Sequence, residues 1–223
     1  MYRKEILSYI VSIFLVSAAC VLHALDYYNL VNFPVHTMVL VLYTIVIFMW
    51  MHNMINRVLR PSIVTRVKLI AILLICYLTV RTVKYEIFMG NEDAVRIARN
   101  FYLVFPLILT QLVFLTSLHV GKSERENISK YWNLLWIPTC VSALLILTND
   151  YHELVFSADP NARGLNLYGP VFYFILIYIG ILAILTITFT MLYSTKTSHM
   201  SSVNLPISIL VIWTIYTLSL IHI

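Results

Sequence analysis

Charged residues are scarce in this chain. Of its 223 residues, only 11% are Asp, Glu, Lys or Arg, whereas 61% are hydrophobic. A soluble globular domain carries about 25% charged residues, so the composition excludes an ordinary soluble fold. The net charge is +5, but no basic stripe is interleaved with aromatic residues as in nucleic-acid-binding proteins. We therefore expect the lipid bilayer to surround the chain, and we expect no nucleic-acid partner.

Cysteine is nearly as scarce. Cys20, Cys76 and Cys140 each stand alone inside an apolar run. Their isolation excludes a disulfide framework and a cysteine-based zinc site, and it predicts three buried, small hydrophobic side chains. Since no Cys and His residues stand at a metal-ligand spacing either, the sequence predicts no metal ion and no cofactor.

The motifs of several membrane-protein classes are also missing. His152 and Glu153 begin like the zinc-protease motif HExxH, but Phe156 stands where the second histidine is required. The last apolar segment, 205–223, has no lysine that could form a Schiff base with retinal. No phosphate-binding loop and no intramembrane-protease spacing is present. We therefore do not expect the chain to be an enzyme.

Long apolar segments dominate the chain. A transmembrane helix needs about 20 consecutive, mainly apolar residues. Seven segments meet this requirement, at 6–25, 35–55, 67–88, 101–120, 134–156, 170–193 and 205–223. The predicted fold is all-α, a polytopic membrane helix bundle with seven transmembrane helices in a single domain, 1–223. Pro, Gly and Asn between the fifth and sixth segments predict an irregular loop, and no soluble output domain is expected after the last segment.

The basic residues predict the orientation of these segments. With the N-terminus inside, the inner side holds ten of them: Arg3, Lys4, Arg57, Arg60, Arg66, Lys68, Lys122, Arg125, Lys130 and Lys196. The outer loops then hold Arg96, Arg99 and Arg163. Since cytoplasmic loops are enriched in Lys and Arg, we expect the N-terminus on the inner side.

Polar residues gather near the outer ends of three predicted helices. An ionised side chain at mid-membrane costs about 2.5–3.5 kcal/mol by insertion scales, so such groups are expected to find water or partners. Residues three or four apart share one face of a helix, which groups His23 with Asp26, Arg81 with Lys84, and Asn149 with His152 and Glu153, beside Asp150. We hypothesise that these eight residues form an outward-open, ligand-binding polar pocket between the first, third and fifth helices. The alternative is that Arg81 and Lys84 reach the outer headgroups separately.

Two segments resemble a known family. LTNDYHELVF at 147–156, followed by YGPVFY at 168–173, resembles the hallmark of the histidine kinase N-terminal 7TM region, the multi-span sensor region of certain bacterial histidine kinases. RTVKY at 81–85 looks like the third helix of that family, and ARNFYLVFP with LHVGK, within 98–122, is similar to its fourth helix and following loop. The resemblance covers most of 60–193. The chain departs from the family at Val171, where a glycine is expected.

The resemblance implies signal sensing in a two-component system. It implies a multi-pass protein of the bacterial cytoplasmic membrane that receives an unknown small ligand or peptide and acts on a cytoplasmic histidine kinase or another output module; a homodimer is compatible with this role. The chain has neither a phosphoacceptor-histidine segment nor ATP-binding boxes, so it is expected to be a sensor that is truncated or split from its output domains and not itself a kinase.

Two other functions stay open. A small transporter or an ion- or proton-conducting protein would use Asp150, His152, Glu153 and Arg81. Such a protein predicts polar residues that continue to the inner side, or internal repeats. Beyond Gln111 neither pattern is visible in the sequence. A purely structural membrane subunit is the remaining alternative.

Overall fold

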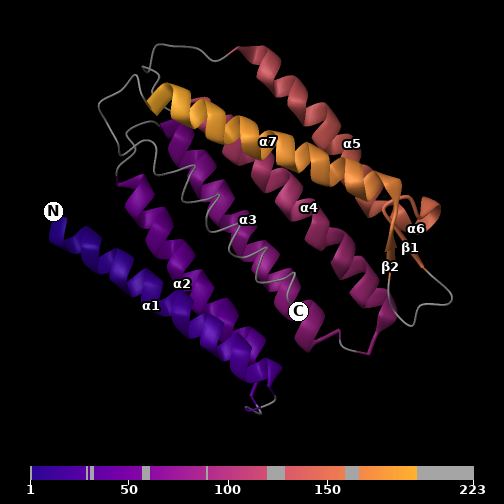
Figure 1. The fold of residues 1–223 in the computed structure, drawn as a ribbon, viewed down its shortest axis with the longest axis horizontal. Helices are drawn as coiled ribbons and strands as arrows, with labels where there is room; N and C mark the ends of the chain where they lie inside the picture. Colours follow the sequence, from indigo (N-terminus) through magenta and orange to yellow (C-terminus); the bar gives the residue numbers. More distant parts are fainter. Residues whose placement is uncertain are drawn as a thin grey trace. The chain divides into compact units, whose positions relative to one another are not determined.

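The chain is helical almost throughout (Figure 1). The computed structural model describes residues 2–28, 30, 33–56, 61–88, 90–119, 129–158 and 166–194. Within these residues, six helical segments are long and apolar enough to cross a membrane, as expected of a multi-pass membrane protein. The predicted seventh segment, 205–223, lies outside the described residues. The chain divides into two compact units, Met1–Leu59 with Val67–Tyr102, and Arg60–Arg66 with Leu103–Ile223.

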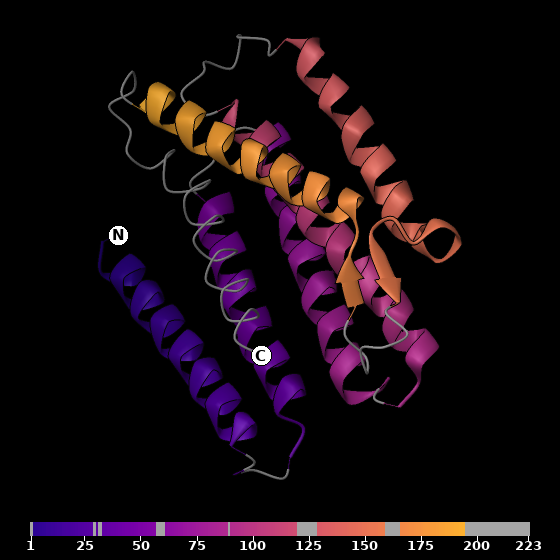
Figure 2. The same cartoon turned by 45° about the vertical axis from the view of Figure 1, so that its right-hand side comes forward.

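The first unit is built on a helical hairpin. It contains α1 (Tyr2–Tyr27), α2 (Val35–Ile55), most of α3 (Pro61–Glu86) and the first part of α4 (Glu92–Ser117). Buried Ala19 of α1 packs with Val35 and Val39 of α2, and the two helices run side by side (Figures 1 and 2). The bounds of α2 are those predicted for the second span. Pro34 precedes this helix, and proline is common at helix starts because its φ is already helical.

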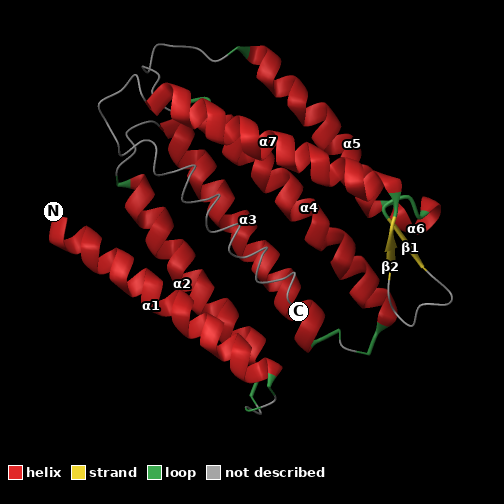
Figure 3. Cartoon of the chain, in the orientation of Figure 1, coloured by secondary structure: helices red, strands yellow, loops and turns green. Residues whose placement is uncertain are grey.

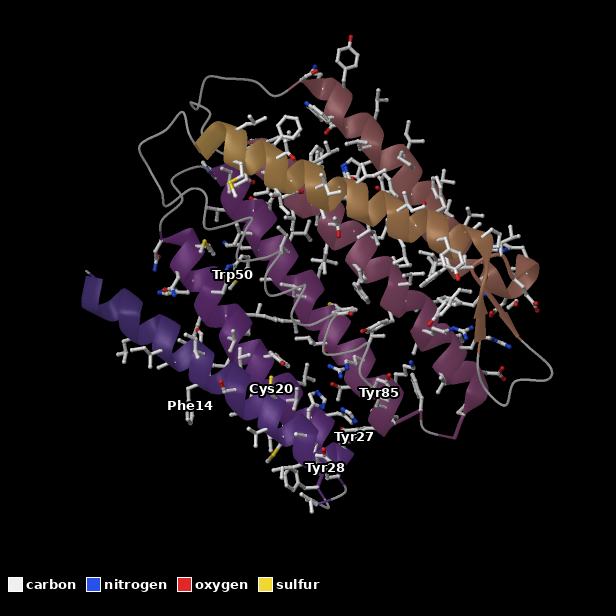
Figure 4. All side chains as sticks on the ribbon, viewed as in Figure 1. Phe14, Cys20, Tyr27, Tyr28, Trp50 and Tyr85 are labelled. Carbon is white, nitrogen blue, oxygen red and sulfur yellow. The ribbon has the colours of Figure 1, made fainter. Side chains whose placement is uncertain are left out.

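Apolar side chains also cover the outside of the helices. Phe14 is 71% exposed and points away from the hairpin (Figure 4). In water such a surface would be costly, but in a bilayer it meets lipid chains of equal polarity. Cys20, Cys76 and Cys140 are likewise exposed. The expectation that they are buried is therefore wrong.

The second unit packs α7 against two other helical segments. It contains the rest of α4, the 3-10 helix η1 (Lys130–Leu135), α5 (Trp136–Leu147), α6 (Asn149–His152), β1 (Phe156–Ala158), β2 (Asn166–Tyr168) and α7 (Pro170–Ser194). One buried cluster joins Leu107 of α4, Ile146 of α5 and Ile175 of α7. A second cluster joins Phe114 of α4 to Trp132 and Phe189, whose rings meet edge to face.

A partly buried tyrosine hydroxyl connects these helices. The hydroxyl of Tyr178 on α7 lies 3.2 Å from Oε1 of Gln111, and 3.0 Å from both the Leu135 carbonyl oxygen and Oγ1 of Thr139. Gln111 is fully buried. This hydroxyl thus joins α4, η1, α5 and α7, in a place where hydrogen bonds between helices help to fix their pairing.

The fifth predicted span ends earlier than expected. The structure ends α5 at Leu147, whereas the predicted helix continued to 156. The short α6 follows and stops at Glu153, whose left-handed φ of 52° is incompatible with a continuing helix. Apolar residues 154–156, which had extended the predicted span, instead lead into β1. This strand pairs antiparallel with β2, with Phe156 opposite Tyr168 (Figure 3), where an irregular loop was expected.

Candidate functional site

The eight predicted site residues fall into two groups. His23, Asp26, Arg81 and Lys84 belong to the first unit, and Asn149, Asp150, His152 and Glu153 belong to the second. In the first unit His23 lies close to Asp26 and Arg81, and in the second unit the four residues follow one another along a single turn. A pocket between the first, third and fifth helices would draw on both units, so that shared pocket stays a prediction.

In the second unit, Asn149 organises the turn between α5 and α7. Its side chain is 2% exposed. Its amide oxygen accepts hydrogen bonds from the backbone N–H groups of Val155 (2.8 Å) and Phe156 (3.1 Å), and its amide nitrogen donates to the Phe156 carbonyl (2.9 Å). Buried backbone groups need such partners. Asn149 therefore supplies to the start of β1 the hydrogen bonds that a neighbouring strand would otherwise supply.

Thr148 and His152 close the same turn. The Thr148 hydroxyl donates to the Leu144 carbonyl (2.7 Å) and lies 3.3 Å from Nε2 of His152. Nδ1 of His152 accepts a hydrogen bond from the Leu154 N–H (3.0 Å). Since Nδ1 accepts, the neutral ring carries its proton on Nε2 and donates it to Thr148. Both ring nitrogens of His152 thus have partners within the turn.

Gly169 brings the second half of the motif against the first. Its N–H donates to the Val155 carbonyl (2.9 Å), and the Val171 N–H donates to the Leu154 carbonyl (3.2 Å). A Cβ atom at Gly169 would lie 2.0 Å from the Leu154 carbonyl oxygen, which no side chain tolerates. LTND-x-H and YGP therefore form one structural element, which we call the Asn149 turn (residues 148–156 and 168–171). On its surface this turn exposes Asp150 and Glu153.

In the first unit, three metal-ligating side chains converge where α1 ends and α2 begins. His23 and Asp26 lie one turn apart on α1, and His36 is the second residue of α2. One ligand atom from each lies within 4.8 Å of the other two. Oδ2 of Asp26 is 3.6 Å from Nε2 of His36, and the two imidazole centroids are 5.6 Å apart. We call this group the His23 cluster; its three members are partly exposed.

Helix α3 supports the cluster from the side of His36. The Tyr85 ring stacks on the His36 ring, with centroids 5.4 Å apart, and Nζ of Lys84 lies 4.8 Å from the Tyr85 centroid. Arg81, one helical turn before Tyr85, is only 5% exposed and is close enough to act electrostatically on His23. Tyr85 lies near the same end of the unit as Tyr27 and Tyr28 (Figure 4).

The first turn of α2 is held by the end of α3. The Thr37 backbone N–H donates to Oε1 of Glu86 (2.8 Å), and the Thr37 hydroxyl donates to Oε2 of the same carboxylate. A carboxylate at this position satisfies N–H groups that lack partners in the helix and favours the positive end of the helix dipole. Glu86 therefore fixes the backbone that carries His36.

Sequence reasoning found His23 and Asp26 but missed His36, Tyr85 and Glu86 as their neighbours. A usable signal was present. His36 follows the short loop between the first two predicted helices and Asp26 precedes it, so two antiparallel helices must place them at the same depth.

Comparison with known proteins leaves the chain without an assigned family, because no family model, no curated protein and no solved structure matches it.

Proposed function

We propose that the chain is a membrane-embedded sensor module of a two-component type, which receives a ligand on its predicted outer side and controls a cytoplasmic histidine kinase. The observation that carries the proposal is the Asn149 turn. Its two sequence halves, which together resemble the hallmark of the histidine kinase N-terminal 7TM region, lie on either side of one hairpin loop and hydrogen-bond to each other. The residues that carry the resemblance are thus the ones that build this turn, which supports the proposal.

The His23 cluster supports an input role. It joins α1 to α2, and α2 is joined to α3 by Tyr85 and Glu86. A ligand that draws these side chains together changes the packing of three helices at once. A ligand shifts the equilibrium between two conformations only if it binds one of them more tightly. The ligand expected here is therefore one that binds more tightly when the side chains of the His23 cluster are drawn together.

Control of a kinase is the decisive test. Membrane vesicles are prepared from cells that express the chain together with a histidine kinase encoded downstream of Ile223 or in a neighbouring gene. Phosphoryl transfer from labelled ATP to the phosphoacceptor histidine of that kinase is compared with vesicles that lack the chain. We expect the rate of transfer to depend on the chain.

Two results would overturn the proposal. The first is an equal rate of phosphoryl transfer with and without the chain. The second is the lack of any histidine kinase gene at these positions. Solute or proton flux through purified chain in liposomes would instead favour the transport alternative, in which Asp150 and Arg81 would be the first residues to replace.

A further inference from the structure

The geometry points to a divalent transition-metal site at His23, Asp26 and His36, with Zn²⁺ as the best-matched ion. The described residues contain this one group of three His, Cys, Asp or Glu side chains close enough to share an ion. Binding by the cluster does not depend on the sensor proposal. The further step, that the ion is the input signal, rests on it.

The ligand set favours a particular class of metal. Two imidazoles and one carboxylate suit Zn²⁺ and its neighbours Co²⁺, Ni²⁺ and Fe²⁺, whereas Mg²⁺ and Ca²⁺ prefer sites made of oxygen ligands alone. Zinc lies about 2.0–2.2 Å from such atoms, so its ligands in a tetrahedral site are about 3.3 Å apart. The three ligand atoms now lie within 4.8 Å of one another, so they must move closer to bind one ion. Rotation of the side chains can bring them closer, because all three side chains are partly exposed.

A second observation is the state of His23. Its Nε2 atom is buried and has no hydrogen-bond partner among the described residues. A buried polar atom of this kind is costly, and it calls for an explanation such as an absent ion. His23 shares its helix face with Asp26, and a ring nitrogen of His23 lies within 4.8 Å of ligand atoms of Asp26 and His36, so an ion at the cluster would meet this imidazole.

The surroundings restrain the orientation of His36. Metal-binding histidines are oriented by contacts outside the coordination sphere. Here Tyr85 stacks on the His36 ring, and Glu86 holds the backbone of the next residue, Thr37. Three protein ligands leave a fourth position open, which is typical of sites that exchange ligands. A bound ion would thus link the ends of α1 and α2 reversibly.

The opposing charge comes from α3. Arg81 is the cation that acts on His23 from this helix, and Lys84 lies beyond the Tyr85 ring. A fixed positive charge weakens cation binding, so the metal proposal predicts that Arg81→Met strengthens binding. If the cluster instead bound an anionic or zwitterionic molecule, Arg81→Met would weaken binding of that molecule and would leave zinc affinity low.

Direct titration tests the site. The full chain is purified in detergent with an affinity tag that lacks histidine, treated with a chelator, and titrated with Zn²⁺ by calorimetry and with Co²⁺ by visible absorption. We expect one ion per chain and no response to Mg²⁺. Replacing Asp26 with Asn or His36 with Ala should weaken binding by more than about 100-fold, because even partners outside the coordination sphere are worth about 10- to 100-fold. Arg81→Met should strengthen it by at least about tenfold, because the change removes a nearby unit positive charge that repels a divalent ion.

His52→Ala is the matched control, since His52 lies at the opposite end of α2 and contacts Asn56. Its zinc affinity should equal that of the unchanged protein. Lack of one-to-one binding, equal affinity in the Asp26→Asn protein, or weaker binding in the Arg81→Met protein would overturn the site. If a variant fails to fold, the tetrahedral Co²⁺ spectrum of the unchanged protein decides, because it reports whether nitrogen and oxygen ligands hold the ion.

The signalling step is tested separately. Zn²⁺ is added to the kinase-containing vesicles described above. A change in phosphoryl transfer that the Asp26→Asn chain lacks would support the ion as the input. Zinc binding to the purified chain without such a change would overturn the input role and leave the site intact, whereas a kinase that ignores the chain altogether would overturn the sensor proposal alone.

Discussion

Glu86 at the end of α3 holds Thr37 in the first turn of α2 through both of its carboxylate oxygens. The two residues are far apart in the sequence, and the contact ties two helices of the first unit together beside the His23 cluster. A side chain from one helix thus provides the N-terminal cap of another.

Removing this cap should destabilise the first unit. We expect Glu86→Ala to lower the free energy of unfolding by about 1–2 kcal/mol, the usual value of a helix cap. Glu86→Gln should cost less, because the amide oxygen still accepts a hydrogen bond from Thr37. The measurement is denaturant-induced unfolding in detergent. In a double-mutant cycle with Thr37→Val, additive losses would show that the two residues do not interact.

Gly169 and Gly180 together provide the sharpest test of the Asn149 turn. Gly169→Ala forces a Cβ atom to 2.0 Å from the Leu154 carbonyl oxygen, whereas a Cβ atom at Gly180 in α7 meets nothing within 4 Å. We expect Gly169→Ala to destabilise the protein by about 1–3 kcal/mol, as overpacking does. Gly180→Ala should be neutral or stabilising by up to about 1 kcal/mol, because alanine favours the helix. Equal thermal stability of both variants would contradict the close contact.

Asn149 should be far less replaceable than its neighbour. Asn149→Ala leaves the Val155 and Phe156 N–H groups without their partner, and each buried unpaired group costs about 1–3 kcal/mol. Asp150→Asn changes an exposed side chain and should stay within about 0.5 kcal/mol. Thermal unfolding of the two variants in the same detergent gives the comparison. If Asp150→Asn lowered the stability as much as Asn149→Ala, the structural role of Asn149 would be contradicted.

Glu153 occupies a backbone conformation that glycine favours. Its φ of 52° lies in the left-handed region, which costs a side-chain-bearing residue about 1–2 kcal/mol. We expect Glu153→Gly to retain or raise stability and Glu153→Val to lower it, because a β-branched residue tolerates this region least. The melting temperature of Glu153→Gly should therefore equal or exceed that of the unchanged protein, and that of Glu153→Val should be lower. A valine variant as stable as the glycine variant would rule out a left-handed Glu153.

Tyr178 should contribute through its hydroxyl. Tyr178→Phe removes the group that lies between Gln111, Leu135 and Thr139. Hydrogen bonds between membrane helices are worth about 0.6 kcal/mol on average and up to about 1.7, and we expect a loss in this range. Tyr173→Phe, on the exposed side of the same helix, should have no effect on unfolding. Equal losses of stability in Tyr178→Phe and Tyr173→Phe would mean that the hydrogen bonds of the Tyr178 hydroxyl do not stabilise the protein.

The helices were predictable because membrane spans follow from apolar length alone. The predicted and observed bounds of α2 coincide, since Pro34 marks its start and the polar residues after Ile55 mark its end. The end of α5 was not predictable in this way. By hydropathy alone, residues 154–156 belong to the span. The chain nevertheless leaves the helix before them, because Asn149 hydrogen-bonds to the backbone of Val155 and Phe156. A count of apolar residues cannot reveal such a side-chain contact.

The candidate site was predictable only in part for a similar reason. His23 and Asp26 share a helix face by their spacing, which a sequence reveals directly. His36 joins them through the pairing of two helices, and Glu86 joins Thr37 across a still longer separation. The expectation of no metal ion was drawn from spacing within single segments. Such spacing does not compare residues from two helices, so it carries no information about the His23 cluster.

The Asn149 turn also bears on the order in which the protein is made. The hydrogen bonds described above for this turn join residues within 144–171, so these bonds need no distant part of the chain. Contacts of this local kind form early, because closing a short loop costs little entropy. During synthesis, α5 and α7 can therefore enter the bilayer as an already joined pair, with their connecting turn complete before residues beyond α7 have left the ribosome.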